Sequence, residues 1–174
     1  MSQFTDKGNY KSTRQTLSNF INEKGFYAAG RLDKDSEGLL VLTNDGILQA
    51  KISHPKNKLK KIYWAQVEGK PTEKGLQILR KGIALKDERC LPASVHVINE
   101  PTYLWKRTPP IRNRKHISET WLEIILSEGK NRQVRRMTAA IGNPTLRLIR
   151  YGVGQWRLDG LSVGSYSKLN IVNE

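Results

Sequence analysis

The 174-residue chain carries 30 Lys and Arg against 16 Asp and Glu, which gives a formal net charge of +14, and its mean hydropathy is −0.57. This length suffices for one well-buried core, so we expect a single folded unit over residues 1–174. No apolar run approaches the ~18 residues of a membrane span, and the chain does not open with a secretory leader. The lone Cys90 excludes an internal disulfide framework. We therefore expect a cytoplasmic monomer with no membrane partner.

The positive charge is concentrated in two stretches. Residues 51–62 hold five lysines and no acid, and residues 105–157 hold twelve Lys and Arg against three Glu. Four aromatic residues lie in the second stretch: Trp105, Trp121, Tyr151 and Trp156. Basic segments with interleaved aromatic residues favour a nucleic-acid partner. A solvated surface or attraction to anionic lipid is the alternative, although no basic amphipathic helix long enough to lie on a membrane is evident.

The first part of the chain predicts short elements around a polar loop. Apolar residues at helical spacing predict a helix over residues 13–21, and residues 26–29 read as extended. A polar loop bounded by glycines follows over residues 30–38. The apolar run 39–43 has the length and composition of a buried strand.

A second group of elements begins at Asn44 or Asp45, either of which can cap a helix over residues 47–53. A strand over residues 62–68 follows the lysine-rich stretch. Residues 72–81 then form a helix that ends before a glycine.

Beyond residue 81 the pattern predicts a strand over residues 94–98 and a basic, proline-containing loop over residues 103–117. Residues 119–127 alternate as a strand with one buried face, and residues 131–141 form a helix with apolar residues at spacings of three and four. A strand over residues 146–151 and short glycine-punctuated strands finish the chain. Helices and strands mix without regular alternation, which predicts an α+β fold with a mixed, largely antiparallel central sheet and flanking helices.

Neither metal nor nucleotide chemistry is indicated by the residues. His54, His96 and His116 lie far apart in the sequence, and Cys90 has no second cysteine with which to share a metal ion. No complete phosphate-binding glycine pattern follows a strand. We therefore expect no metal and no cofactor.

Asp33 stands out in the polar loop. Taken alone, an aspartate between strands is most often a turn or cap residue. Residues 30–33 (Gly-Arg-Leu-Asp) and 38–46 (Gly-Leu-Leu-Val-Leu-Thr-Asn-Asp-Gly), however, resemble the active-site segment of bacterial ribosomal RNA pseudouridine synthases. The resemblance is to the group that includes the small-subunit type and types B, E and F for the large ribosomal subunit. It implies that Asp33 is the catalytic nucleophile.

Two further segments are similar to the same family and occur in the same order. Residues 61–67 (Lys-Ile-Tyr-Trp-Ala-Gln-Val) resemble the strand whose tyrosine stacks on the target base, which implies that role for Tyr63. Residues 128–137 (Glu-Gly-Lys-Asn-Arg-Gln-Val-Arg-Arg-Met) resemble the motif whose arginine holds the catalytic carboxylate, which implies that role for Arg135. A cation beside Asp33 would favour its charged form against the effect of burial.

The remaining similarity extends the resemblance to residue 152. Residues 146–152 are similar to the segment that gives an apolar contact to the base, here through Leu146, and residues 105–112 are most similar to the large-subunit type E. The match departs at the beginning, where the family's first strand, containing Lys-Pro, is missing from this sequence. The small N-terminal RNA-binding domain that many relatives carry is also missing, so we expect target recognition to rest on the core.

The resemblance implies that the chain isomerises one uridine of 23S ribosomal RNA, presented in a structured stem or loop, with base flipping and no cofactor. Arg31, Lys61 and Arg132 are then candidate phosphate contacts, and each could equally be a solvated surface residue. A non-catalytic RNA-binding or ribosome-assembly protein is the alternative, and a DNA-binding regulator that uses the helix over residues 131–141 is a third. Asp33 with Arg135 favours the enzyme, because binding phosphates gives no reason to place a carboxylate in a basic cleft.

Overall fold

The computed structural model describes residues 2–5, 15–111 and 118–170. Its main sheet has six strands in the order β2-β7-β4-β6-β5, with β8 paired to β7. β2 runs parallel to β7, and the other pairs are antiparallel, so the predicted mixed, largely antiparallel sheet is confirmed. The strands are β2 (Glu37–Gly38), β4 (Lys61–Glu68), β5 (Ser94–Ile98), β6 (Glu119–Leu126), β7 (Thr145–Val153) and β8 (Trp156–Arg157).

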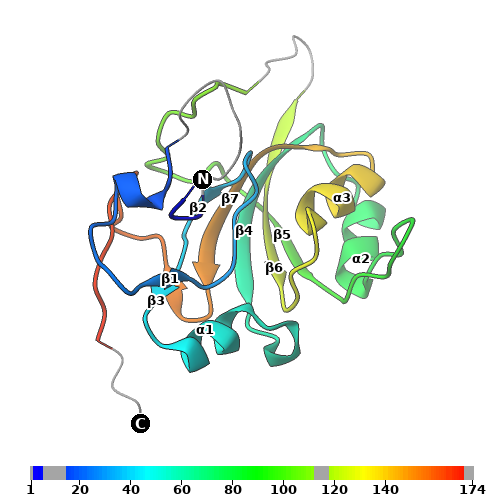
Figure 1. Cartoon of the computed structure of the whole chain (residues 1–174). Helices are drawn as coiled ribbons and strands as arrows, with labels where there is room; N and C mark the ends of the chain where they lie inside the picture. The colour runs from blue at the N-terminus through cyan, green and yellow to red at the C-terminus, as the bar shows by residue number, and fades with distance from the viewer. Residues whose placement is uncertain (1, 6–14, 112–117, 171–174) are drawn as a thin grey trace.

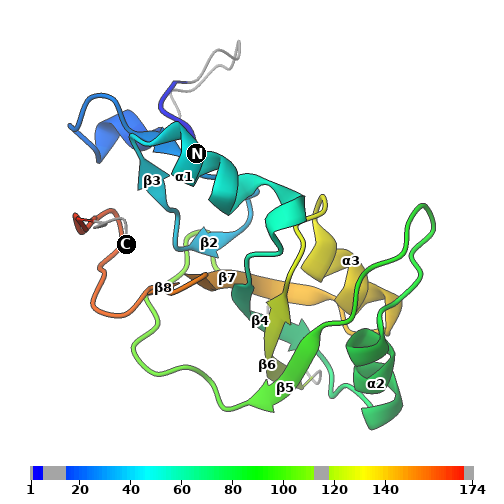
Figure 2. The ribbon, with the colours of Figure 1, turned by 90° about the horizontal axis from the view of Figure 1, so that it is seen from below.

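One face of this sheet is covered by two helices, α2 (Glu73–Lys81) and α3 (Gln133–Ala140), which lie side by side in Figures 1 and 2. Alternation along β6 turns Leu122, Ile124 and Leu126 toward them, and all three are at most 2% exposed. Each such side chain stabilises the fold by about 1.5–3 kcal/mol through loss of contact with water. The alternation predicted from the sequence therefore builds the main core.

The helix boundaries follow capping residues. Thr72 begins α2 by accepting a hydrogen bond from the Gly75 amide at 3.1 Å, and Gly82 ends it. Asp45 begins α1 (Gly46–Ser53) by accepting from the amides of Ile47 and Leu48. Both helices lie within one residue of the predicted ranges, because the caps that fix their ends can be read from the sequence.

A second apolar cluster lies beside the sheet. It includes Ala29, Leu39, Ile52 and Val153, all at most 8% exposed. The short ladder of β1 (Tyr27–Ala28) with β3 (Leu42–Thr43) packs here with α1. Figure 1 shows these three elements grouped together, away from α2 and α3. This second cluster supports the chain on either side of the polar loop.

Two predictions from the apolar pattern are wrong. The run 39–43 is not one strand, because Leu39 leaves the main sheet after its amide donates to the Arg150 carbonyl and the chain pairs with β1 only from Leu42. The predicted helix over residues 13–21 is only the 3-10 turn Leu17–Asn19 in its described part, since the Asn19 side chain accepts from the Thr16 amide and closes the turn locally. Residues 13 and 14 lie outside the described ranges.

The other predicted elements agree with the structure at their centres. The loop predicted over residues 103–117 has no helix or strand as far as residue 111, and residues 112–117 lie outside the described ranges. Of the short strands predicted after residue 151, the structure shows β8 in the part of the chain that it describes. In the same residues, no helix is long and apolar enough to cross a membrane.

Gly38 sets the distance between the polar loop and the sheet. Its φ is +107°, and a Cβ at this position would lie 2.4 Å from the backbone oxygen of Arg150. We expect Gly38→Ala to lower the free energy of unfolding by more than about 2 kcal/mol, through backbone strain and the clash. Gly129 has open space around it, so Gly129→Ala should change stability by less than about 0.5 kcal/mol. Urea denaturation of both variants measures the difference, and equal stabilities would contradict the close approach.

Candidate active site

Asp33 lies in a turn of the polar loop that joins β1 to β2. The turn is closed by a hydrogen bond of 3.0 Å from the Ser36 amide to the Asp33 carbonyl, and the Asp33 side chain is exposed. No Lys or Arg within the described ranges forms an ion pair with this carboxylate at 4.0 Å or less. The loop therefore presents Asp33 as an accessible carboxylate.

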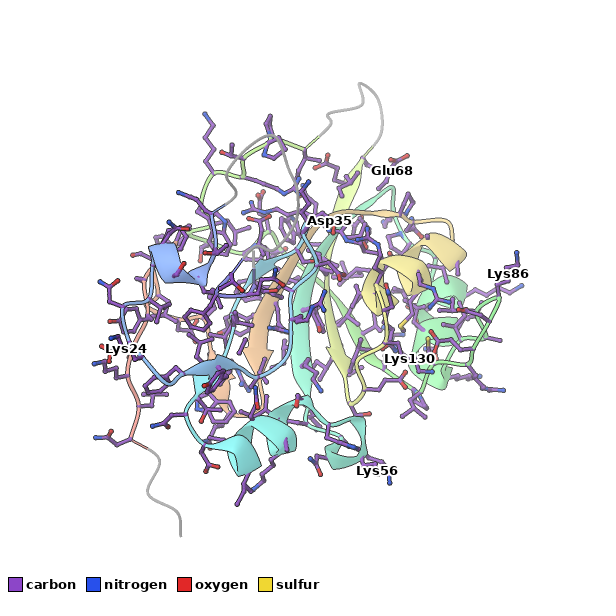
Figure 3. All side chains as sticks on the ribbon, in the orientation of Figure 1. Lys24, Asp35, Lys56, Glu68, Lys86 and Lys130 are labelled. Carbon is purple, nitrogen blue, oxygen red and sulfur yellow. The ribbon has the colours of Figure 1, made fainter. Side chains whose placement is uncertain are left out.

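Asp35, two residues on, fastens the loop to α3. Its carboxylate accepts two hydrogen bonds from Arg132, at 2.9 and 2.8 Å, and lies 3.3 Å from Nε of Arg135. The Arg135 Nη2 also donates to the Asp35 carbonyl at 2.7 Å. Hydrogen bonds from Arg132, with the charges of both arginines, hold the pKa of Asp35 below its ordinary value, against the opposing effect of burial. Figure 3 shows Asp35 near the middle of the molecule, whereas the labelled Lys24, Lys56 and Lys86 lie toward its edge.

Glu37, two residues further, fastens the same loop to the other side of the sheet. Arg147 donates from Nε and Nη2 to its two oxygens at 3.1 and 3.0 Å. Arg107 donates at 3.0 Å, and the indole of Trp105 donates at 2.6 Å. The side chains of Arg147 and Glu37 are only 8% and 18% exposed, so solvent screens this pair weakly.

The three acids of the loop, Asp33, Asp35 and Glu37, therefore differ in their partners. Asp35 and Glu37 are held by arginines 70 to 110 residues away in the sequence, whereas Asp33 has no ion-pair partner among the described residues. The negative charge of Asp33 nevertheless acts on Arg132 and Arg135, since it contributes to a raised pKa at the first and opposes the lowered pKa at the second. Within the described ranges, the carboxylate therefore has these two cations near it and no direct ion-pair partner.

Arg135 pairs differently from our prediction, which placed it directly on Asp33. Its contacts in the structure are with Asp35 and with the carbonyl of Thr145, at 3.1 Å. Burial lowers the pKa of Arg135, and Asp35 is the first of the groups that raise it. Arg135 therefore supports the loop through Asp35. It interacts with Asp33 through its charge and not through a direct contact.

Tyr63 lies on the helix-covered side of β4, opposite Arg150 of β7. Arg150 is only 6% exposed, and it donates to the carbonyls of Leu39 at 2.8 Å and Arg31 at 3.2 Å. These two carbonyls flank the Asp33 turn. The guanidinium of Arg150 therefore joins both ends of the loop to the sheet beside Tyr63.

The remaining candidate residues are distributed around this centre. Lys61 is half-buried, and burial, followed by the charge of Arg150, lowers its pKa. Arg31 is exposed, whereas Arg132 is engaged by Asp35 with 46% of its side chain accessible. Leu146 is half-buried at the register shift of β7 against β4. Arg31 lies two residues before Asp33, and Lys61 lies close enough to Arg150 to feel its charge. Neither has a carboxylate partner among the described residues.

Sequence reasoning missed the residues that hold the loop: Asp35, Glu37, Arg107, Arg147 and Arg150. An acid at every second position of the loop was the one available signal, and it does not say which distant arginine each acid meets. In the ranges that the structure describes, no three His, Cys, Asp or Glu residues gather as metal ligands. His116, one of the three histidines weighed for a metal site, lies outside those ranges.

The comparisons with known proteins define the class. The family model described as RNA pseudouridylate synthase matches residues 2–140, so the chain belongs to the RNA pseudouridine synthase family, as the motifs indicated. The solved "Crystal structure of pseudouridylate synthase" agrees with a TM-score of 0.73 at 28% identity, over 89% of this chain and 62% of that one. The chain thus spans about three-fifths of that solved protein.

Among the relatives that are similar to this chain, several are named ribosomal large subunit pseudouridine synthase E. The Vibrio vulnificus protein is 56% identical over 171 residues, which cover 98% of this chain and 71% of that one. The Xanthomonas axonopodis pv. citri protein is 51% identical over 93% of this chain and 84% of its own. A Bacillus subtilis relative named synthase B is 34% identical over 94% of this chain and 61% of its own.

The ion pairs of Asp35 predict a pH effect on stability. Because the pKa of Asp35 is lowered in the folded state, its stabilising effect is present above its ordinary value of 3.8 and is lost as the pH falls below it. Asp35→Asn should therefore melt below the wild type at pH 7, and the gap should narrow as the pH falls below 3.8 and close once the pH is below the lowered folded-state pKa. Melting temperatures across this range measure the gap, and a gap independent of pH would contradict the pairing.

Proposed function

We propose that this chain isomerises a uridine of large-subunit ribosomal RNA to pseudouridine, with Asp33 as the nucleophile. Family membership supports the reaction, and the names of the Vibrio and Xanthomonas relatives support the substrate. One observation carries the assignment of Asp33. Of the three acids in the loop, it alone has no ion-pair partner within the described residues, while its neighbours Asp35 and Glu37 hold the loop beneath it.

The isomerisation of uridine requires few groups other than such a carboxylate. The bond from the uracil N1 to the sugar C1′ breaks, the base turns, and a bond from C5 to C1′ replaces it, with the C5 proton moving to the freed nitrogen. Substrate and product have the same atoms and the same oxidation state, so neither a redox group nor an energy source is required. Asp33 forms a transient bond to the substrate and must be ionised to do so. The cationic side chains of Arg132 and Arg135 lie close enough to interact with its charge.

Access to Asp33 requires the target nucleotide to leave its helix. A uridine stacked within a duplex cannot reach a carboxylate in a loop that is fastened to the sheet, so the base is flipped out at a cost of a few kcal/mol. Tyr63, on the strand beneath the loop, supplies an aromatic face worth about 1–3 kcal/mol of stacking. Leu146, at the end of the neighbouring strand, gives the base an apolar contact. Together these residues offset the cost of unstacking.

RNA binding rests on the positive surface around the same loop. Arg31 and Lys61 have no carboxylate partners among the described residues and can meet phosphates directly. Arg132 contributes mainly through its exposed edge, because Asp35 occupies its guanidinium. Charge at these positions supplies sequence-independent affinity that weakens as salt rises.

Asp33→Asn tests the nucleophile. The amide has nearly the same shape but cannot form the covalent bond, so we expect the single-turnover rate to fall at least ~10⁴-fold while RNA affinity changes less than about threefold. Asp45→Asn is the matched control. It also removes one negative charge, and asparagine caps a helix as well as aspartate, so rate and affinity should stay at wild-type values.

Pseudouridine formation in large-subunit ribosomal RNA and RNA binding are measured for both variants. A residual rate above a tenth of the wild type in Asp33→Asn would overturn the assignment. Loss of RNA binding in that variant, with the rate at saturating RNA unchanged, would make Asp33 a binding residue. Failure of the wild type to modify large-subunit ribosomal RNA would overturn the substrate instead.

A further inference from the structure

Arg150 carries a hydrogen-bonding group that the loop does not use. Its Nε and Nη1 donate to the carbonyls of Leu39 and Arg31, but its Nη2 is buried with no hydrogen-bond partner among the described residues. The side chain is 6% exposed, and no described carboxylate forms an ion pair with it. A buried N–H left without an acceptor destabilises the protein, and more so when it is charged. The two loop carbonyls accept hydrogen bonds from Nε and Nη1, and Nη2 has no acceptor among the described residues.

The surroundings of this guanidinium are those of the proposed active site. Tyr63 lies opposite Arg150 in the register of β4 and β7. The charge of Tyr63, the approach of its hydroxyl to the guanidinium, and then the charge of Asp33 partly offset the lowering of the Arg150 pKa by burial. Both side chains therefore lie close to the guanidinium, although the Tyr63 hydroxyl does not reach hydrogen-bond geometry with Nη2. A base stacked on Tyr63 and approached by Asp33 would therefore present its edge to Nη2.

We propose that Nη2 of Arg150 donates a hydrogen bond to a carbonyl oxygen of the target uracil, which makes Arg150 a residue that binds the edge of the base. This inference rests on the proposed function, since it needs a uridine at Tyr63. Uracil offers carbonyl oxygens at C2 and C4. A contact at C4 would also select uracil over cytosine, which carries there an amino group that cannot accept, whereas both bases carry a carbonyl at C2. Binding of uracil gives the unpaired N–H its acceptor, and a base with a donor at the contacted position leaves it unpaired.

Two substrate analogues test the contact without altering the protein. The target uridine is replaced by 2-thiouridine or by 4-thiouridine in an RNA that the wild type modifies, because sulfur accepts a hydrogen bond more weakly than oxygen. For the wild type we expect one analogue to lower kcat/KM about tenfold, as the weakening of a charged hydrogen bond would, and the other to lower it less than about threefold. The analogue that loses activity identifies the contacted oxygen.

Arg150→Met then assigns the contact to this residue. In this variant both analogues should react within about threefold of uridine, because no guanidinium remains to distinguish oxygen from sulfur. The comparison is a ratio within one protein preparation, so a smaller folded fraction does not alter it. If the variant has no measurable rate, the ratio of Kd values for the same RNAs replaces it. Arg157→Met is the matched control, since Arg157 donates to the carbonyls of Gly154 and Trp156, and it should keep the wild-type discrimination.

The inference is overturned if both thio analogues match uridine in the wild type, or if Arg150→Met keeps the wild-type discrimination. The proposed function fails differently, by absence of isomerisation of the unmodified RNA by the wild type. Discrimination that vanishes in Arg150→Met and persists in Arg157→Met supports the contact.

Discussion

The site depends on the attachment of one short loop at Asp35 and Glu37. Arginines of α3 hold the first carboxylate, and arginines from β7 and from the segment before β6 hold the second. Bidentate arginine pairs fix direction as well as distance, so the backbone between them has little freedom. Asp33 gains its position from these pairs, while its own oxygens form no ion pair with the residues that the structure describes. A carboxylate that is both fixed and unpaired is what covalent attack on a substrate requires.

Because of this attachment, the site forms only when the rest of the fold is complete. The partners of Asp35 and Glu37 lie 70 to 110 residues further along the chain, and Arg150 reaches back to Arg31 and Leu39 across a similar separation. The loop can be ordered only after β7 has joined β4 and α3 has packed on the sheet. The positive field at Asp33 and its geometry therefore arise together, because the same arginines that hold the loop supply the charge.

The sequence predicts local features better than long-range ones. The cap at Asn44 or Asp45, the glycine after residue 81 and the alternation of β6 predict elements that the structure confirms, since these signals act within a few residues. The run 39–43 misled because Leu39 bonds to β7 whereas Leu42 and Thr43 pair with β1, and only the partner strands reveal the break. The motif around Asp33 identified the loop, and family membership agrees with it. The pairing of Arg135 with Asp35, and the roles of Glu37 and Arg150, depend on which distant residues meet, which no local pattern contains.

The most direct test of this account is the single-turnover rate of Glu37→Gln at saturating RNA. Loss of the charged pairs should let the loop move, and a displacement of about 1 Å at Asp33 can cost ~100-fold in rate, with Kd for RNA nearly unchanged. Glu73→Gln, which breaks a Glu–Arg pair on α2 far from the loop, is the control and should keep the wild-type rate. A Glu37→Gln enzyme with the wild-type rate would show that Asp33 does not owe its position to this attachment.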